Sequence, residues 1–570
     1  MFDTLTRMGA STAGAYKINK SLRFNPGDNA NLNRTPSSTT SRTTWTFSFW
    51  VKRSKFGSTQ GIFGTSGSDN NTHTEFFFAS GENFCWGAAT KDYYRTDRLF
   101  RDPCAWYHIV AVCDTTNGTQ ADRQPLYVNG ARVTQFSTQN LTGDSTEFGI
   151  NRNVEHKLGE RPNGSDEFSG YLAEVHFVDG TALDHTSFGE TDEVTGQWIP
   201  KKYTGSHGTN GFYLDFKDTS ALGTDQSTNS NNWTPNNFST SAGVDNDSLT
   251  DTPTNNWCTW NPLVKSANTF TEGNLKVTCT SSTPAKIVGT IGVTSGKWYF
   301  EEKLTTVTNV TVGVTSNTAS SNYLGVGDSI SFWPSAASGF NVFRNSSNIS
   351  SDVTGGSGTG TNWAIDDIIG IALDMDNKNV HCYKNGTLAG TVSFSSFGSD
   401  WDEVYFGGGN YIASQVYNTN FGQRDFSNLP AGYKALCTNN LPEPTIKKST
   451  DHFNTILYTG NGNASQSKTV GFQPDLVWIK SRSFVEDHML YDSIRGTGKD
   501  LRSNLTNTEG DNDQGLNAFN SDGFTIGTMQ NVNKNNKTYV AWCWKAGGSP
   551  SSNSDGTITS SVSANATAGF

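Results

Sequence analysis

The sequence predicts an all-β protein built from tandem β-sandwich modules. Apolar residues make up only 34% of the chain whereas aromatic residues reach 12%, and this mixture suits thin cores filled by rings. Short runs of alternating apolar and polar residues recur between polar turns, and no helical stripe exceeds about three turns. At 570 residues the chain is long enough for roughly three or four domains.

The first module is expected over residues 21–218, after a short N-terminal arm over residues 1–20. Trp45, Phe47, Phe49 and Val51 fall on one face of a strand, which predicts that this strand is half-buried. The Asn-Gly dipeptide within residues 126–133 supplies the positive φ angles of a type I′ turn and predicts a hairpin. Further strands are expected over residues 106–112 and 168–177.

A polar connector is expected over residues 219–256, because this stretch is rich in Asn, Ser and Thr and shows no apolar periodicity. Its composition is compatible with an ordered wrap or with a linker. The second module follows over residues 257–435. Within it, residues 366–388 predict two strands joined by a tight polar turn, followed at once by a second turn at Asn385-Gly386.

The third module is expected over residues 441–548, and residues 549–570 form a tail. Strands are predicted over residues 453–458, 470–480 and 538–545. The tail closes with Ala-Thr-Ala-Gly-Phe, which is typical of the start of another strand. The tail is therefore a candidate start of a further repeat, or the place where a longer product is processed or cut short.

Two modules resemble known families of β-sandwich. Residues 295–301 (Ser-Gly-Lys-Trp-Tyr-Phe-Glu) and the Asp-rich hairpin of residues 366–386 are similar to the conserved strands of SPRY domains. In the first module, residues 106–114, 126–130 and 168–177 resemble, in order and separation, a laminin-G-like or concanavalin-A-like jelly roll. These resemblances imply tandem jelly-roll sandwiches that bind rather than catalyse, and they do not identify the ligand.

The third module resembles a repeated module in structural proteins of marine phages, especially cyanophages. The resemblance lies in residues 471–482, 490–496 and 539–547, and the stretches at 8–11 and 251–263 have the same character. It implies a virion fibre or structural protein whose arm, residues 1–20, is a candidate attachment to the particle. Other virion proteins would be partners, and a homotrimer is the usual state of such fibres, although no coiled-coil heptad supports it here.

Composition argues against several function classes. The formal charge of −11 argues against a general nucleic-acid surface, which needs clustered Lys and Arg. No run of about 18 apolar residues is present, so membrane insertion is not expected, and the N-terminus lacks the apolar core of a secretory signal. The eight cysteines form no C-x-x-C pair and are expected to be buried free thiols. A virion protein made in the host cytoplasm and released by lysis satisfies these constraints, so the virion is the expected location.

Catalytic patterns are incomplete, so we expect no enzymatic activity. Glycoside hydrolases with a jelly-roll fold need two carboxylates on one strand face. Glu190 and Asp192 begin such a string, but Thr195 occupies the position of the second Glu. The other near misses are Asp374 with Asp376 and Glu301 with Glu302. No metal-binding histidine pair, nucleophile elbow or phosphate loop is found in the sequence.

Two kinds of ligand site remain as candidates. Ca²⁺ suits loops that supply oxygen ligands with loose geometry, and Asp28, Asp114 and Asp166 lie in such loops, although Asp is common in loops in any case. A sugar needs an exposed aromatic platform beside polar groups. Tyr93, Tyr94 and Trp333 are the candidates for that platform, and burial in the core is the alternative for each ring.

The sequence therefore favours a phage tail-fibre or spike-type protein that adheres to the host surface, through a glycan or a surface protein. The alternative is a capsid or tail decoration protein that uses lectin-like folds for protein contacts only. A bacterial adhesin or carbohydrate-active enzyme would need an export signal or a carboxylate pair, and neither pattern is found.

Overall fold

The computed structural model describes residues 16–264, 268–279, 285–307, 310–316, 323–335, 339–355, 362–410 and 415–570. The chain forms two compact units: an N-terminal unit of residues up to 191 and 198–441, and a C-terminal unit of residues 442–570 to which residues 192–197 are also assigned. β-Strands make up nearly all of the regular structure, which confirms the all-β fold class. Of the predicted arm over residues 1–20, residues 1–15 lie outside the described residues.

Helices are few and short. Within the ranges given above, the single α-helix is α1, Gln530–Asn533. The 3₁₀-helices are η1 (Pro26–Asp28), η2 (Gln120–Asp122), η3 (His185–Ser187), η4 (Glu272–Asn274), η5 (Ser350–Asp352), η7 (Ser399–Trp401), η8 (Thr438–Asn440) and η9 (Ser449–Asp451). No helix in this part of the chain has the length and apolar character needed to cross a membrane.

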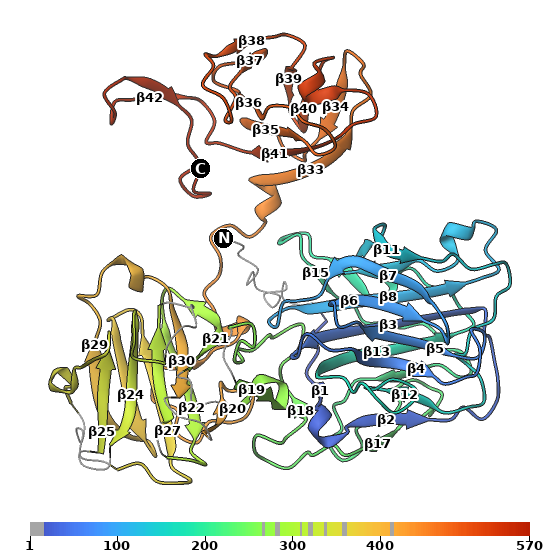
Figure 1. The fold of residues 1–570 in the computed structure, drawn as a ribbon, viewed down its shortest axis with the longest axis vertical. Helices are drawn as coiled ribbons and strands as arrows, with labels where there is room; N and C mark the ends of the chain where they lie inside the picture. Colours follow the sequence, from blue (N-terminus) through green and yellow to red (C-terminus); the bar gives the residue numbers. More distant parts are fainter. Residues whose placement is uncertain are drawn as a thin grey trace. The chain divides into compact units, whose positions relative to one another are not determined.

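Two antiparallel eight-stranded sheets form the first sandwich, coloured mostly blue to green in Figure 1. One sheet has the order β10-β9-β8-β3-β13-β1-β18, with β16 also paired to β13, and the other has the order β11-β7-β6-β5-β4-β12-β2-β17. The strands of the first sheet are β1 (Ser21–Phe24), β3 (Thr44–Arg53), β8 (Trp106–Asp114), β9 (Leu126–Val128), β10 (Ala131–Arg132), β13 (Gly170–Asp179), β16 (Phe212–Leu214) and β18 (Ser248–Leu249). Those of the second are β2 (Asn31–Arg34), β4 (Gln60–Thr65), β5 (Thr74–Phe78), β6 (Asn83–Gly87), β7 (Asp92–Leu99), β11 (Phe136–Gln139), β12 (His156–Leu158) and β17 (Thr234–Asn236). A separate hairpin joins β14 (Gly189–Thr191) to β15 (Trp198–Pro200).

Strand β3 is buried on both faces, so the prediction of a half-buried strand is wrong. The predicted face does point into the core between the sheets, where Trp45 and Phe47 are 0% exposed. On the opposite face, Trp50 and Lys52 are each 1% exposed. Part of that face is covered by the second sandwich, since Trp50 belongs to the same hydrophobic cluster as Trp260. Another part is covered by the first sandwich itself, where Thr46 donates to the Thr181 carbonyl.

The two sheets of the second sandwich have the orders β19-β20-β31-β22-β27-β28-β29, with β32 paired to β22, and β21-β30-β23-β24-β25-β26. Their strands are β19 (Asn268–Thr271), β20 (Lys276–Cys279), β21 (Ala285–Val293), β22 (Lys297–Lys303), β23 (Val310–Thr315), β24 (Ser329–Ser335), β25 (Gly339–Arg344), β26 (Ser347–Asn348), β27 (Ile368–Asp374), β28 (Asn379–Lys384), β29 (Thr387–Ser393), β30 (Val404–Asn410), β31 (Val416–Asn420) and β32 (Lys434–Ala435). The predicted hairpin over residues 366–388 is confirmed as β27–β28, and the turn that follows has φ of 49° at Asn385 and 80° at Gly386. Both angles are positive, as a type I′ turn requires.

Residues 219–256 form an ordered wrap rather than a free linker. Within them, β17 pairs with β2 and β18 pairs with β1. The connector therefore adds an edge strand to each sheet of the first sandwich before it enters the second. Figure 1 shows β1, β18 and β19 in the region between the two sandwiches.

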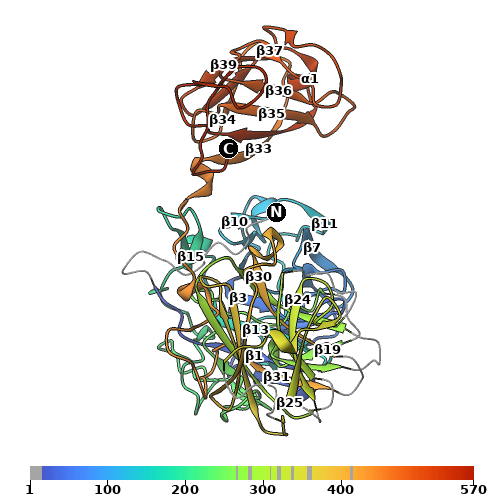
Figure 2. The same ribbon diagram turned by 90° about the vertical axis from the view of Figure 1, so that its left-hand side faces the viewer.

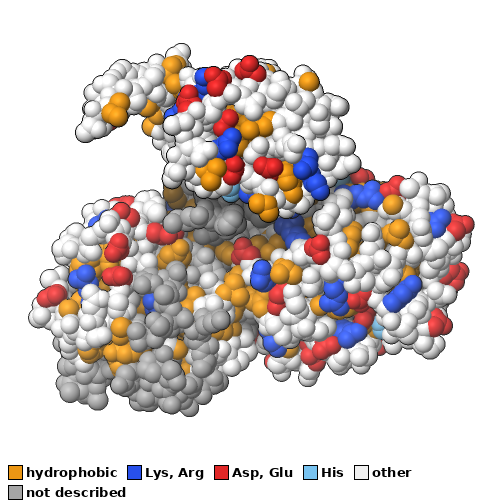
Figure 3. All heavy atoms as spheres, turned by 45° about the horizontal axis from the view of Figure 1, so that its top comes forward, with side chains coloured by type: hydrophobic (Ala, Val, Ile, Leu, Met, Phe, Trp, Pro, Cys, Tyr) orange, Lys and Arg blue, Asp and Glu red, His pale blue; other side chains and the backbone are white. Residues whose placement is uncertain are grey.

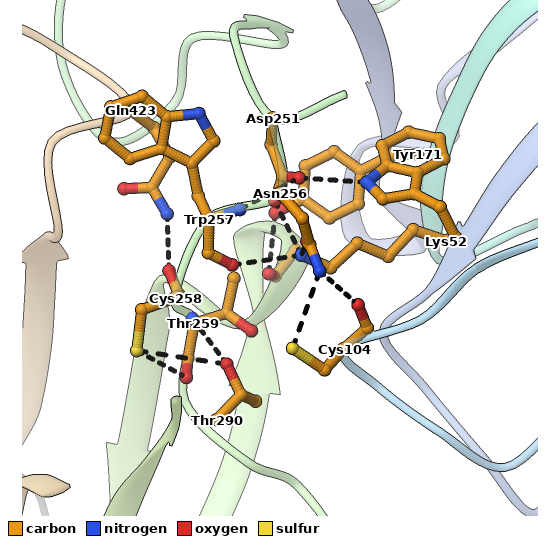
Figure 4. Close-up of polar contacts among 12 residues, drawn as sticks. Lys52, Cys104, Tyr171, Asp251, Asn256, Trp257, Cys258, Thr259, Thr290 and Gln423 are labelled. Carbon is orange, nitrogen blue, oxygen red and sulfur yellow. Dashed lines mark hydrogen bonds and ion pairs between the residues drawn. The ribbon is translucent and has the colours of Figure 1, made fainter. Parts of the chain in front are cut away.

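A buried ion pair joins β3 to the end of the connector. The Lys52 ammonium lies 2.7 Å from the Asp251 carboxylate, and the two side chains are 1% and 0% exposed. Lys52 also donates to Asn256 Oδ1 at 2.7 Å and to the Trp257 carbonyl at 3.2 Å (Figure 4). Asp251 accepts a further bond from the Trp106 indole N–H at 3.1 Å. All three ammonium hydrogens thus have acceptors, which is the condition for tolerating a buried charge.

Arg23 on β1 forms a second buried junction. Its guanidinium pairs with Asp247 of the connector at 3.0 Å and with Glu272 of η4 at 2.5 Å, and the Arg23 side chain is 0% exposed. It also donates to the Val244 carbonyl at 3.0 Å. These bonds hold connector residues 244–247 beside the second sandwich.

The C-terminal unit has a hydrophobic core of its own. It contains a four-stranded sheet, β33-β41-β35-β36, and a three-stranded sheet, β34-β40-β39 (Figure 2). Its buried residues include Ile479, Phe524 and Tyr539. The strands are β33 (Phe453–Thr459), β34 (Gln466–Thr469), β35 (Leu476–Ser481), β36 (Met489–Asp492), β37 (Lys499–Asp500), β38 (Gly510–Asp511), β39 (Leu516–Asn520), β40 (Gly523–Ile526), β41 (Thr538–Trp544), β42 (Ser551–Asn553) and β43 (Ser560–Val562). The last two form an exposed hairpin in the tail.

All eight cysteines are free and buried, as the sequence predicted. Two buried histidines of the first sandwich are held in the neutral form. Burial lowers the pKa of His108 to about 3 and that of His156 to about 4. In each ring one nitrogen accepts a bond, His108 Nδ1 from the Trp198 indole at 2.9 Å and His156 Nε2 from the Asn151 amide at 3.2 Å. A proton added to that nitrogen would point at the hydrogen of the donor, so the contact also disfavours the charged form of each ring.

We expect Asp251→Asn to destabilise the N-terminal unit, because it leaves the Lys52 charge buried without a counter-ion. The free energy of opening at β3, measured by native-state hydrogen exchange, should fall by about 3–5 kcal/mol. The matched control is Asp122→Asn, which breaks an exposed pair with Arg132 and should change stability by about 1 kcal/mol or less. Equal effects of the two substitutions would show that Asp251 does not balance Lys52.

The two buried histidines should contribute less to the stability of the N-terminal unit as the pH drops from about 6.5 towards 4. The folded state depresses the pKa of His108 and His156, so the stabilisation from their neutral forms is complete above the unfolded-state pKa and is lost below it. Each histidine should contribute about 1.4 kcal/mol per pH unit in that window. Urea unfolding between pH 7.5 and pH 5.0 measures the slope, and His108→Asn with His156→Asn should lower the slope even though the variant is less stable. Equal slopes for the wild type and the double variant would contradict this account, because buried Glu302, whose pKa is raised to about 8, gives both proteins the same opposing slope.

Candidate functional site

The N-terminal unit contains a cleft of about 790 Å³ between the connector and the second sandwich. Connector residues 242–246 form one wall, and strands β20, β22 and β31 contribute Lys276, Glu301 and Asn418. The loop after β31 completes the lining with Arg424, Asp425 and Ser427. Because Arg23 holds the connector wall through Val244 and Asp247, the first sandwich determines the shape of the cleft.

Three cations line the cleft, and they differ in their partners. Lys303 pairs with Asp366 at 3.1 Å, and both side chains are largely exposed. In the described part of the chain, neither Lys276 nor Arg424 has a carboxylate within 4 Å. Burial and the nearby charge of Arg23 lower the pKa of Arg424 to about 10, so its guanidinium still carries its charge at neutral pH.

The two neighbouring glutamates of β22 lie on opposite faces of the strand. Glu301 faces the cleft, where it accepts bonds from the backbone amides of Ser427 at 3.0 Å and Asn428 at 2.7 Å. Glu302 is 0% exposed, accepts from the Thr419 hydroxyl at 2.6 Å, and has its pKa raised to about 8 by burial. The pair cannot act together on one substrate, because a strand directs successive side chains to opposite faces.

The other near misses for catalysis have local structural partners. Asp374 pairs with Lys297 at 2.8 Å and accepts from the Asn377 amide in the β27–β28 turn. Asp192 accepts from the backbone amides of Val194 and Thr195. These carboxylates therefore shape turns.

A serine and a histidine also meet in the first sandwich, but in the wrong orientation for a nucleophile. His108 Nε2 lies 2.9 Å from Ser48 Oγ. Because His108 Nδ1 accepts the Trp198 N–H, the single ring proton sits on Nε2 and is donated to Ser48. A general base would need a free lone pair at that nitrogen.

The structure places two of the predicted sugar-binding aromatics in the core. Tyr93 and Tyr94 are each 2% exposed and pack against Phe148 and Phe136. Their expected exposure is wrong, because β11 and neighbouring loops cover β7, and buried rings offer no platform for a sugar. Trp333 of β24 is only partly buried and packs against Tyr323 and Phe343 with ring centroids 5.7 and 5.4 Å apart, so it stays a prediction.

The three predicted calcium ligands belong to separate local arrangements. Asp28 accepts from the Asn25 amide at 2.7 Å, and Asp114 accepts from the Thr116 hydroxyl at 2.7 Å. Asp166 pairs with Arg161 at 3.2 Å. Among the described residues, no group of three or more His, Cys, Asp or Glu side chains is placed to hold a metal ion. The structure thus does not bring Asp28, Asp114 and Asp166 together.

Sequence reasoning missed every cationic residue of the cleft. Lys276, Lys303 and Arg424 are far apart along the chain and belong to no motif, and the connector wall was recognised only as polar. The one signal in the sequence was the connector itself. A long polar segment between two sandwiches, if it is ordered, must pack against the surface of one of them, and a polar cleft can form along that contact. Figure 3 shows that, on the face drawn, acidic and basic side chains are scattered without a continuous basic patch.

Family models match three parts of the chain. A model described as the concanavalin A-like lectin/glucanases superfamily, of laminin-G type, matches residues 26–186, and the SPRY domain model matches residues 297–424. A domain of unknown function (DUF7483) matches residues 448–570. No curated protein matches the chain.

Several solved structures match parts of the chain at low identity. The SPRY domain of human HERC1 is 19% identical, with 28% of this chain and 96% of that chain covered and a TM-score of 0.23. The SAP-like pentraxin of Limulus polyphemus is 19% identical, with coverages of 30% and 80% and a TM-score of 0.22. A Bacteroides ovatus protein named for carbohydrate binding is 18% identical, with coverages of 39% and 59% and a TM-score of 0.26. At these TM-scores none of the three informs the function of this chain.

The family matches agree with the sheet topology of the N-terminal unit, in which two β-sandwiches follow one another. Lectin-like folds are therefore present in the chain. The chain contains a concanavalin A-like laminin-G domain and a SPRY domain, followed by a domain of unknown function.

Proposed function

We propose that this chain is a phage virion protein of the tail-fibre or spike type that adheres to the host surface by binding a glycan in the cleft. The observation that carries the binding role is the cleft itself, which the second sandwich and the ordered connector line and which Arg23 of the first sandwich holds in shape through the connector. Its size falls within the range of ligand sites in proteins, and amide, hydroxyl and charged groups line it.

The phage assignment is supported by the sequence of the C-terminal unit. Residues 471–482, 490–496 and 539–547 resemble the repeated module of marine phage structural proteins. The eight buried free thiols suit a protein made in the host cytoplasm and carried on the virion after lysis. In this proposal other virion proteins anchor the chain, and a homotrimer presents several clefts at once.

Adhesion by such a protein needs only a weak individual site. When several copies on one particle engage one cell, the second and later contacts form at high effective concentration, and the avidity exceeds the affinity of a single cleft by orders of magnitude. A polar, solvent-connected cleft without a deep apolar pocket is adequate for this task.

The proposal predicts that the purified chain competes with phage adsorption to host cells. Thr305→Trp, which places an indole at an exposed edge of the cleft, should abolish competition, and Thr119→Trp at a distant exposed position should retain it. Immunogold labelling of virions with antibody to residues 16–250 should mark the distal end of tail appendages.

Different outcomes would overturn different parts of the proposal. Even labelling of the capsid together with failure to compete would favour the decoration role. Absence of the chain from particles would exclude a virion role, whereas equal competition by both Trp variants would remove the cleft from the proposal.

A further inference from the structure

We propose that the cleft takes a saccharide that carries a carboxylate, with Arg424 as the group that binds the acid. This inference rests on the proposed glycan-binding function of the same cleft and names the class of sugar. It begins from two polar atoms of the lining that lack partners in the described structure.

The first atom is a donor on Arg424. One guanidinium nitrogen, Nη2, donates to the Thr419 carbonyl at 2.9 Å, whereas Nη1 is buried and has no hydrogen-bond partner among the described residues. A buried guanidinium with an unused N–H is unfavourable unless an acceptor reaches it. The planar fork of Arg suits a carboxylate, which can accept two parallel bonds from it.

The second atom is an acceptor on Asn418. Its Oδ1 is buried without a partner in the same part of the chain, while its Nδ2 makes a long contact of 3.4 Å with Thr305 Oγ1. Asn418 and Arg424 both line the cleft. An unused acceptor and an unused cationic donor in the lining of one cleft are complementary to a ligand that carries both a hydroxyl and a carboxylate, as a uronic or other sugar acid does.

The acids nearest to Arg424 cannot replace such a ligand. Glu301 is occupied by the amides of Ser427 and Asn428. Burial raises the pKa of Glu302 to about 8, so its carboxyl is mostly neutral at pH 7, and it bonds to Thr419. Asp245 on the connector wall makes no ion pair with Arg424 within 4 Å. The charge of Arg424 therefore remains available.

The overall charge of the lining limits how acidic the ligand can be. Lys276, Lys303 and Arg424 are balanced by Asp245, Glu301 and Asp425 around the same cleft. A polyanion such as a nucleic acid or polyphosphate would meet these carboxylates and be repelled, whereas an isolated carboxylate needs only Arg424, with Lys276 adding long-range attraction. The lining holds no aromatic ring among its described residues, which favours recognition through polar groups over stacking on a neutral sugar face.

The experiment is binding of the full chain to oligosaccharides that contain glucuronic acid or sialic acid, compared with the same compounds after reduction of the carboxyl to an alcohol. We expect the acid forms to bind and reduction to weaken binding at least tenfold. Arg424→Gln should weaken binding of the acid form by a similar factor and leave the reduced form unchanged.

Because Arg424 is mostly buried, Arg424→Gln could weaken binding by disturbing the fold, so a second variant at another cation of the cleft serves as a control. Lys276→Gln removes a partly exposed cation without an ion-pair partner, and should weaken binding of the acid form a few-fold and reduce its salt dependence. Equal binding of acid and reduced sugars, unaffected by either variant, would overturn the inference and leave the proposed function standing. Absence of binding to every glycan would overturn the proposed function itself, and binding of an acidic peptide instead would overturn both.

Discussion

The buried pair of Lys52 and Asp251 is the constraint on which the N-terminal unit depends. Removing two charges from water costs several kcal/mol for each ion, and the pair is stable only when every hydrogen-bonding position is filled. Here that requires β3, the end of the connector and the Trp106 indole to be in place together. The pair therefore couples folding of the first sandwich to docking of the second, because neither charge is satisfied until both are in place. Apolar contacts alone tolerate more than one arrangement of the two sandwiches.

Arg23 extends this constraint to the ligand site. By pairing with Asp247 and Glu272 and binding the Val244 carbonyl, it converts a polar connector into a fixed wall. Arg23 lies on the first sandwich, while most of the cleft belongs to the second. The shape of the cleft thus depends on both sandwiches, although the second sandwich and the connector supply its lining.

The fold was more predictable from the sequence than the site. Period-two patterns and Asn-Gly turns predicted β3, β8, the β9–β10 hairpin and β27–β28, because strand alternation and turn chemistry are local. Burial of the second face of β3 was missed because it depends on contacts with a distant module. Tyr93 and Tyr94 were misjudged for the same reason, since polar neighbours along the chain do not reveal what covers a strand. Arg424 and Asn418 become a site only through tertiary contacts, so no spacing in the sequence indicates them.

The double burial of β3 has a consequence for how such chains can be recombined. A crossover anywhere within residues 219–256 would separate Arg23 from Glu272, and one before residue 247 would also separate Arg23 from Asp247 and Lys52 from Asp251. The two sandwiches must therefore be inherited, or exchanged in a laboratory chimera, as one block. The segment around residues 442–448, where the second compact unit begins, is the natural breakpoint. A library of chimeras built on this scaffold should shuffle whole N-terminal units and vary the lining of the cleft within them.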